Sequence, residues 1–172
     1  MSQSSSANDT LIPATESQQN SSVPQAAAGW RRLLTQTSPL GIDLGLLVVR
    51  ASFGLALALA HGYGKLVNPE RFIQGLTTRG FPLPGFFGWA AIVSEFVGGL
   101  LLALGLLTRP AAALVLVTLS VAAFDVHADD PFKKKELALA YAVVGLALLV
   151  TGAGRLSLDQ HLFGPKHAKR NS

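Results

Sequence analysis

Apolar residues gather into four blocks along the chain, and polar or charged residues separate them. The blocks cover about residues 44–60, 86–107, 110–124 and 137–151. A helix of a soluble domain keeps a polar face toward water, yet residues 111–124 carry no charge and only Thr118 and Ser120 as polar side chains. This pattern is typical of helices surrounded by lipid. It predicts an all-α fold, an integral membrane up-down four-helix bundle.

The predicted helices differ in how completely they fill a membrane. A crossing needs about 20 mostly apolar residues. The second block is interrupted only by Ser94 and Glu95, whereas the third and fourth blocks are shorter and need flanking residues. We therefore expect helices over about residues 42–62, 86–107, 110–124 and 136–152.

Two segments outside these helices show weaker helical patterns. Residues 63–85 contain the stretch PERFIQGLTTRG before the turn FPLPG, and we expect this connection to lie on the membrane surface or over the mouth of the bundle. The stretch SLDQHLFG predicts a short interfacial helix with Ser157 as its N-cap. Arg155 and Asp159, four residues apart, are predicted to tie the end of the fourth helix to this segment.

The composition of the tails predicts the limits of the domain, and the distribution of basic residues bears on its orientation in the membrane. Residues 1–29 are rich in Ser, Gln, Asn and Ala and lack signal-peptide features, which predicts a disordered, retained tail before a domain at 30–165. The net charge is +4, and the basic tail at 166–172 fits anionic lipid headgroups better than nucleic acid. Basic residues are almost balanced between the two sides. Those beside Trp30 and in the C-terminal tail favour two cytoplasmic termini.

The sequence also excludes several kinds of redox chemistry within this chain. It has no cysteine, so disulfides, thiolate metal sites and iron–sulfur ligation are excluded. No HxxxH or HExxH spacing indicates a metal site, and there is no nucleotide-binding glycine loop or haem attachment motif. Electrons that pass near this chain therefore need a quinone or a partner's cofactor. A complete redox enzyme in this chain alone is not expected.

Ionisable residues inside the predicted spans are the first functional candidates, because burying a charge in a membrane is costly. Arg50 lies within the first predicted helix and Glu95 near the middle of the second. At 100° per residue, Asp43, Arg50 and His61 fall on one stripe of the first helix. The stripe must face other helices, so we predict an Arg50–Glu95 pair. The pair has two interpretations, proton handling and simple fixing of the helix register.

A second group of polar residues gathers where three predicted helices end on the same side. The group consists of His61, Lys65, Asp125, His127, Glu136 and Tyr141. Such residues could handle protons or orient the carbonyl of a quinone. They could equally be interfacial side chains that only hydrate the helix ends.

Three segments resemble the DoxX family of small four-helix bacterial and archaeal membrane proteins. They are RASFGLALALAHGYGKL at 50–66, SEFVGGLLLALGLLTRPAAALV at 94–115 and GAGRLSLDQHL at 152–162. The resemblance implies the family positions Arg50, Gly62, Lys65, Glu95, Gly98, Gly99, Arg109, Arg155 and Asp159. The family takes its name from a subunit of a thiosulfate:quinone oxidoreductase, and other members are linked to quinone or catechol stress.

Two functional hypotheses follow. In the first, the chain is a quinone-interacting subunit of an oxidoreductase assembly in the bacterial inner membrane. Its proton or quinone handling then falls to Arg50, His61, Lys65 and Glu95, and its quinone mouth consists of Asp125, His127 and Tyr141. In the second, it is a non-catalytic membrane scaffold or a small-solute permease. The expected partners are lipid, subunits of a redox complex or further copies of this chain.

Overall fold

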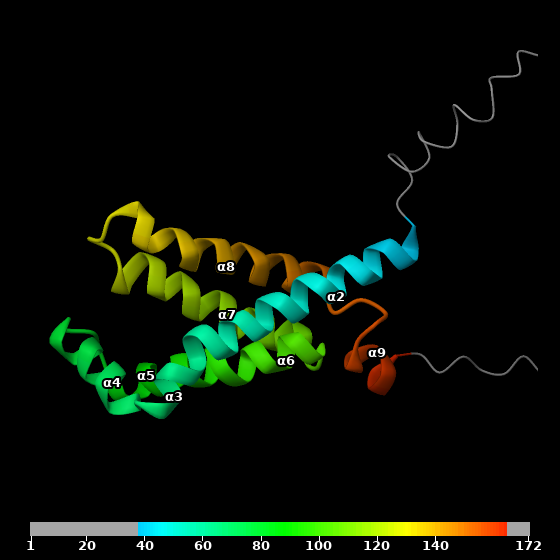
Figure 1. Ribbon diagram of the computed structural model, residues 1–172. Coiled ribbons are helices and arrows are strands. Elements are labelled where there is room, and N and C mark those ends of the chain that lie inside the picture. The colour runs from blue at the N-terminus through cyan, green and yellow to red at the C-terminus, as the bar shows by residue number, and fades with distance from the viewer. Residues whose placement is uncertain (1–37, 165–172) are drawn as a thin grey trace, which may run out of the picture. The chain divides into compact units, whose positions relative to one another are not determined.

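The computed structural model describes residues 38–164, and every regular element in that range is helical (Figure 1). The all-α prediction is therefore confirmed for this part of the chain. The predicted tail at 1–29, the start of the predicted domain at 30–37 and the basic tail at 166–172 lie outside the described residues.

The first long helix is a continuous run of three segments. They are α2 (Pro39–Ala56), the π-helical η1 (Leu57–Gly62) and α3 (Tyr63–Val67). The helix begins where Ser38 accepts a hydrogen bond of 3.0 Å from the Gly41 amide, and it ends before Pro69, which disfavours helical geometry in the residue preceding it. It is longer than predicted at both ends, because the cap and the proline set its ends rather than the edges of the apolar block.

The second long helix is built in the same way, after a short helix that packs against it. Its segments are α5 (Pro84–Val93), the π-helical η2 (Ser94–Gly98) and α6 (Gly99–Leu104). The predicted helix in the long connection is confirmed as α4 (Pro69–Thr78). It packs closely on α5, where a Cβ on Gly88 would lie 2.6 Å from Cγ1 of Ile73.

The remaining helices complete the described chain. They are α7 (Thr108–Val121), the π-helical η3 (Ala122–Val126), α8 (Phe132–Thr151) and α9 (Leu158–Phe163). The helix α8 packs along α7, and α9 lies near the start of α7 and the end of α6 (Figure 1).

Within residues 38–164, three helices are long and apolar enough to cross a membrane. They are Pro39–Val67, Pro84–Leu104 and Thr108–Val126, with mean hydropathies of 1.9, 1.8 and 1.6. Large apolar side chains point outward from the bundle, for example Val117 at 61% and Val150 at 70% exposure. Such a surface is suited to lipid rather than to water.

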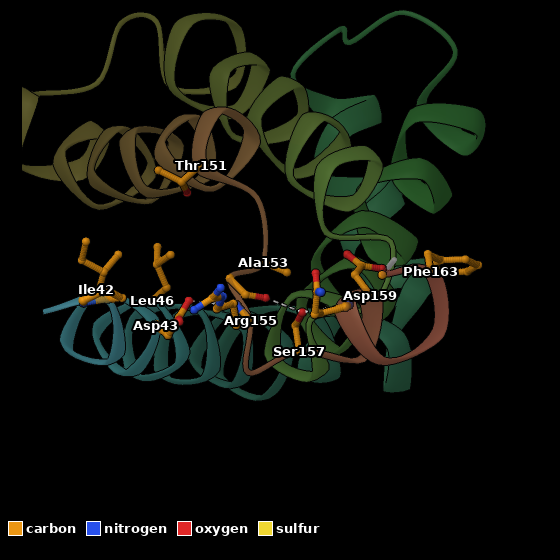
Figure 2. Close-up of a pocket in the computed structure, with 13 residues that line it drawn as sticks. Ile42, Asp43, Leu46, Thr151, Ala153, Arg155, Ser157, Asp159 and Phe163 are labelled. Atoms are coloured by element: carbon orange, nitrogen blue, oxygen red, sulfur yellow. Dashed lines mark hydrogen bonds between the residues drawn. The ribbon is translucent and has the colours of Figure 1, made fainter. Parts of the chain in front are cut away.

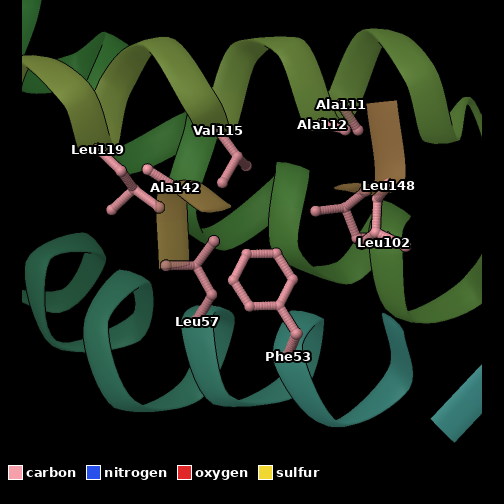
Figure 3. Close-up of a cluster of buried hydrophobic side chains, with 9 residues drawn as sticks. All are labelled: Phe53, Leu57, Leu102, Ala111, Ala112, Val115, Leu119, Ala142 and Leu148. Carbon is pink, nitrogen blue, oxygen red and sulfur yellow. The ribbon is translucent and has the colours of Figure 1, made fainter. Parts of the chain in front are cut away.

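Buried apolar side chains from α2, η1, α6, α7 and α8 meet in one core (Figure 3). The cluster consists of Phe53, Leu57, Leu102, Ala111, Ala112, Val115, Leu119, Ala142 and Leu148. The first two long helices approach so closely that a Cβ on Gly54 would clash with the Gly99 carbonyl, and one on Gly62 would lie 2.6 Å from the Phe96 amide nitrogen. These small residues fix the register in which the two helices meet.

Candidate functional site

The buried side chain of Arg50 does not pair with Glu95, so that prediction is wrong. Arg50 is 2% exposed, and its Nη1 donates to the carbonyls of Ala103 at 2.8 Å and Leu102 at 3.4 Å. Its Nη2 donates to the Leu156 carbonyl. The first two carbonyls belong to the last turn of α6, where a helix has no partners of its own and favours a cation. Arg50 therefore caps the C-terminus of α6.

Asp159 binds the other side of the same turn. Its carboxylate accepts hydrogen bonds from the amides of Leu107 at 2.7 Å and Thr108 at 2.9 Å, at the N-terminus of α7. Its own amide donates to the Gly105 carbonyl at 2.8 Å. Partial burial alone would raise the pKa of Asp159, but the hydrogen bonds from Thr108 and Leu107 outweigh it and lower the pKa. We call Arg50, Asp159 and the turn between α6 and α7 the turn clamp.

The segment between α8 and α9 is held by a short-range cap and by long-range hydrogen bonds with Asp43 and Arg50. Ser157 accepts from the Gln160 amide at 3.2 Å, which confirms it as the N-cap of α9. The amide of Arg155 donates to Asp43 at 2.9 Å. The prediction that Arg155 and Asp159 together connect the end of the fourth helix to this segment is wrong. Asp159 accepts hydrogen bonds from the free amides at the N-terminus of α7 instead.

These residues line a cavity of about 730 Å³ between the start of α2, the segment after α8 and α9 (Figure 2). Pro39, at the start of α2, and Gly164, after α9, also line the cavity.

Glu95 pairs with Lys65 instead of Arg50. The Lys65 Nζ lies 2.5 Å from Oε1 and 2.7 Å from Oε2 of Glu95. The Glu95 side chain is 4% exposed and that of Lys65 27% exposed. Lys65 also lies over the ring of Phe72, 4.5 Å from its centroid, a cation–π contact that the sequence analysis missed. The close contact of Gly62 with Phe96 places Lys65, one turn later, beside Glu95.

Three of the candidate residues lie in π-helical segments. His61 belongs to η1, Glu95 to η2 and Asp125 to η3. A π-helical turn follows an i→i+5 pattern and holds more residues than an α-helical turn, and such turns occur frequently at functional sites. The stripe calculated at 100° per residue is therefore lost after Ala56, and His61 and Lys65 point elsewhere than Arg50 does.

His61 faces α8. Its ring packs edge-to-face on Tyr141, with centroids 5.6 Å apart at 85°, and Tyr141 packs in the same way on the buried ring of Phe53 at 5.3 Å. Both His61 and Tyr141 are partly exposed. The structure thus brings these two predicted residues together, on a different helix pair from Lys65 and Glu95.

The other predicted mouth residues lie in and around the loop before α8: Asp125 in η3, His127 in the loop and Glu136 in the first turns of α8. Nδ1 of His127 lies 2.7 Å from Asp130, which also accepts from Lys134 at 2.9 Å. The hydrogen bond with His127, followed by that with Lys134, lowers the pKa of Asp130 to about 2. Asp125 and Glu136 are exposed. In residues 38–164, no three His, Asp or Glu side chains gather as a metal site would require.

A second cavity of about 410 Å³ lies between α3, α4 and η3. Its walls include Lys65, Asn68, Arg71, Phe72, Arg79 and His127. Arg71 and Arg79 were not predicted as site residues, although their spacing of eight places both on one face of the amphipathic helical pattern at 69–80.

Apolar helices joined by close glycine contacts, with ion pairs and arginine hydrogen bonds between them, define a helical membrane protein. The chain belongs to the DoxX family, whose model, described as DoxX, matches residues 45–128. The matched range includes Arg50, Lys65 and Glu95.

Several known proteins are similar to this chain over most of their length. An uncharacterised protein of Haemophilus influenzae is 38% identical over 70% of this chain and 84% of that protein. The Bacillus subtilis "Putative oxidoreductase CatD" is 30% identical over 72% of this chain and 91% of that protein. The Escherichia coli "Inner membrane protein YphA" is 29% identical over 67% and 88%, respectively. No solved structure matches the chain.

Proposed function

We propose that this chain is a quinone-interacting subunit of a membrane oxidoreductase assembly in which His61, Lys65 and Glu95 handle protons. The observation that carries the proposal is a carboxylate only 4% exposed that is hydrogen-bonded to a lysine 27% exposed. Ionisable groups buried in membrane helices are typical of proton pathways. His61 precedes Lys65 on the same helix and is partly exposed, so the group can connect the interior of the bundle with water.

The chemistry divides between this chain and a partner. Reduction of a quinone to a quinol takes two electrons and two protons. In this proposal a redox centre of a partner subunit supplies the electrons. His61 and Tyr141 donate hydrogen bonds to one quinone carbonyl, and His61 delivers a proton to that oxygen. Lys65 passes a proton to the Glu95 carboxylate, which delivers it to the other quinone oxygen. The protons come from water through the partly exposed Lys65 and His61.

Two of the predicted mouth residues, Asp125 and His127, have no role in this proposal. His127 is bonded to Asp130 and Asp125 is exposed, so neither is assigned to the quinone. The name of the similar Bacillus subtilis protein, which contains the word oxidoreductase, supports redox chemistry without naming a substrate. The name of the Escherichia coli relative supports an inner-membrane location.

We further propose that α8 is a fourth crossing and that both termini lie in the cytoplasm. The helix has 20 residues, which span about 30 Å, and its charged residues at 133–136 lie in its first turns, where a lipid headgroup region would begin. Because the sequence has no cysteine, single-cysteine variants can test this. A membrane-impermeant thiol reagent outside the cell should label Asn68→Cys and Ala128→Cys but not Leu40→Cys.

The quinone proposal is tested by extracting bound quinone from protein purified in native lipid discs. Wild-type protein should retain quinone, and His61→Ala, which removes a proposed hydrogen-bond donor to the quinone, should retain at least fivefold less at equal folding. Glu95→Gln removes only the proposed proton delivery, so it should retain quinone. Asp129→Asn is the matched control, since it neutralises an exposed carboxylate in the loop at the same end. Wild-type protein without quinone would contradict the proposal.

A non-catalytic scaffold is the second candidate, and the turn clamp favours it. Arg50 and Asp159 bond mainly to main-chain groups, a structural use of charge in both cases. In that case purified protein carries partner subunits without quinone.

A further inference from the structure

We propose that the 410 Å³ cavity between α3, α4 and η3 binds a phosphate-bearing anion at the membrane surface. This site is separate from the proposed quinone contact at His61 and Tyr141, and it extends beyond the proposed function.

The lining brings together four basic side chains and no carboxylate. Lys65, Arg71, Arg79 and His127 all line the cavity, together with the amide side chain of Asn68. Glu95, which is paired with Lys65, and Asp130, which is paired with His127, lie outside the lining. Arg79 also lines a neighbouring pocket with Asp125, Asp129 and Asp130, but within residues 38–164 neither Arg71 nor Arg79 forms an ion pair.

The two arginines have hydrogen-bond donors to spare. Arg79 donates from Nη1 to the Val126 carbonyl at 2.7 Å, a bond that holds α4 to η3 and leaves its other donors unused. Within residues 38–164, the Arg71 guanidinium makes no hydrogen bond or ion pair. A guanidinium offers a planar fork of N–H groups that matches the oxygens of a phosphate. Two such groups on one wall point to a phosphate rather than to a neutral ligand.

Glycines keep the cavity open. Gly64 and Gly75 both line it, and a Cβ added at either would meet nothing within 4 Å. Gly75 lies inside α4, where glycine weakens a helix relative to alanine. Because Gly75 has no side chain, the space beside it stays open for a ligand.

The position of the cavity indicates the source of the phosphate. It lies at the end of the span Pro39–Val67, whose last residues include the exposed side chains of Tyr63, Leu66 and Val67. A lipid headgroup would reach the basic wall from this edge while its acyl chains remain against the apolar residues. A free phosphate ion offers the same chemistry from the aqueous side.

Native mass spectrometry of the full chain in detergent tests the site with two probes, phosphatidylglycerol and inorganic phosphate. Wild-type protein should retain at least one of them as a discrete bound species. Arg71→Gln should weaken that binding about tenfold, and Arg71→Lys should restore only part of it, since lysine keeps the charge without the fork. Lys133→Gln, which removes an exposed cation of the same region, should change binding less than twofold.

A second variant tests the space rather than the charge. Gly75→Leu keeps every cation, adds bulk where the lining is open and favours helix, so α4 should stay folded while binding is lost. Retention of the lipid alone identifies a headgroup, and retention of inorganic phosphate identifies a free anion. Equal binding by wild type, Arg71→Gln and Lys133→Gln would overturn the site, as would no binding of either probe to wild type. Quinone content should be unchanged in Arg71→Gln, so this test and the quinone test fail independently.

Discussion

The two ends of the helical bundle use buried charge in opposite ways. At the turn clamp, Arg50 gives its hydrogen bonds to three main-chain carbonyls. At the other end, the buried carboxylate of Glu95 is hydrogen-bonded to the side chain of Lys65. Main-chain carbonyls do not change their protonation state, whereas a carboxylate and an amine can. The hydrogen bonds of Arg50 can therefore only hold the fold together, whereas the Lys65–Glu95 pair can also respond to protons.

The difference also follows from where each group obtains its partners. The turn clamp satisfies groups that every helix end leaves unpaired, with a cation at the C-terminus of α6 and an anion at the N-terminus of α7. The Lys65–Glu95 pair forms between two side chains and satisfies no unpaired backbone group. A charge in a membrane that the backbone does not require is the stronger functional candidate.

The largest effect is expected from Arg50→Leu. The substitution leaves buried carbonyls of Leu102 and Ala103 without a donor, and each such group costs about 1–3 kcal/mol. With the Leu156 carbonyl included, we expect a loss of about 3–5 kcal/mol in the free energy of unfolding, measured by circular dichroism during denaturation in mixed micelles. Arg109→Leu is the control, because that guanidinium makes a single exposed bond of 3.5 Å, and it should cost less than about 0.5 kcal/mol.

The same measurement tests whether the two ends are independent. Arg50 and Glu95 belong to separate hydrogen-bonded groups, so the effects of Arg50→Leu and Glu95→Leu should add within about 0.5 kcal/mol. If the double variant is more stable than the sum of the two single effects predicts, Arg50 and Glu95 interact after all, as the sequence suggested.

A somewhat smaller effect is expected from Lys65→Leu. Breaking a buried pair strands the remaining charge and costs about 3–5 kcal/mol, and the 27% exposure of Lys65 reduces this to about 2–4 kcal/mol. In the double variant Lys65→Leu/Glu95→Leu no charge is stranded, so part of the loss should return. Strictly additive effects would show that the pair contributes nothing.

How much of this was predictable differs between helices and contacts. Runs of apolar residues predicted the long helices because lipid imposes length and composition on them. Their ends were less accurate, since Ser38 and Pro69 act outside the apolar block. The capping role of Ser157 was predictable, because it depends only on residues three positions apart.

Contacts between helices were not predictable in the same way. The Arg50–Glu95 prediction assumed a helix register that the close contacts of Gly54 with Gly99 and Gly62 with Phe96 exclude. It also assumed a uniform turn, which η1 interrupts. The glycines were visible in the sequence, but which backbone each one meets depends on the packing of the whole bundle.

Asp159→Asn should have a modest effect that depends on pH. Loss of a charged acceptor at the start of α7 is expected to cost about 1 kcal/mol at neutral pH. The folded state lowers the pKa of Asp159 below 3.8, so its contribution is present above that pH and disappears as the pH falls through the folded value. Stability curves of wild type and variant should therefore converge in acid. Parallel curves would show that the carboxylate charge is not what stabilises the turn.

The smallest effect is expected at Asp130, which belongs to the exposed loop rather than to either buried group. Its pKa of about 2 arises first from the hydrogen bond with His127 and then from that with Lys134. Lys134→Ala should raise this pKa toward the ordinary value of an aspartate, as followed by the carboxyl carbon signal of Asp130 in an NMR titration. Lys133→Ala, which leaves both hydrogen bonds in place, is the control and should shift the titration less. If neither variant moves the titration, the loop contacts do not persist in solution. Only the buried ends of the bundle would then hold their charges in fixed geometry.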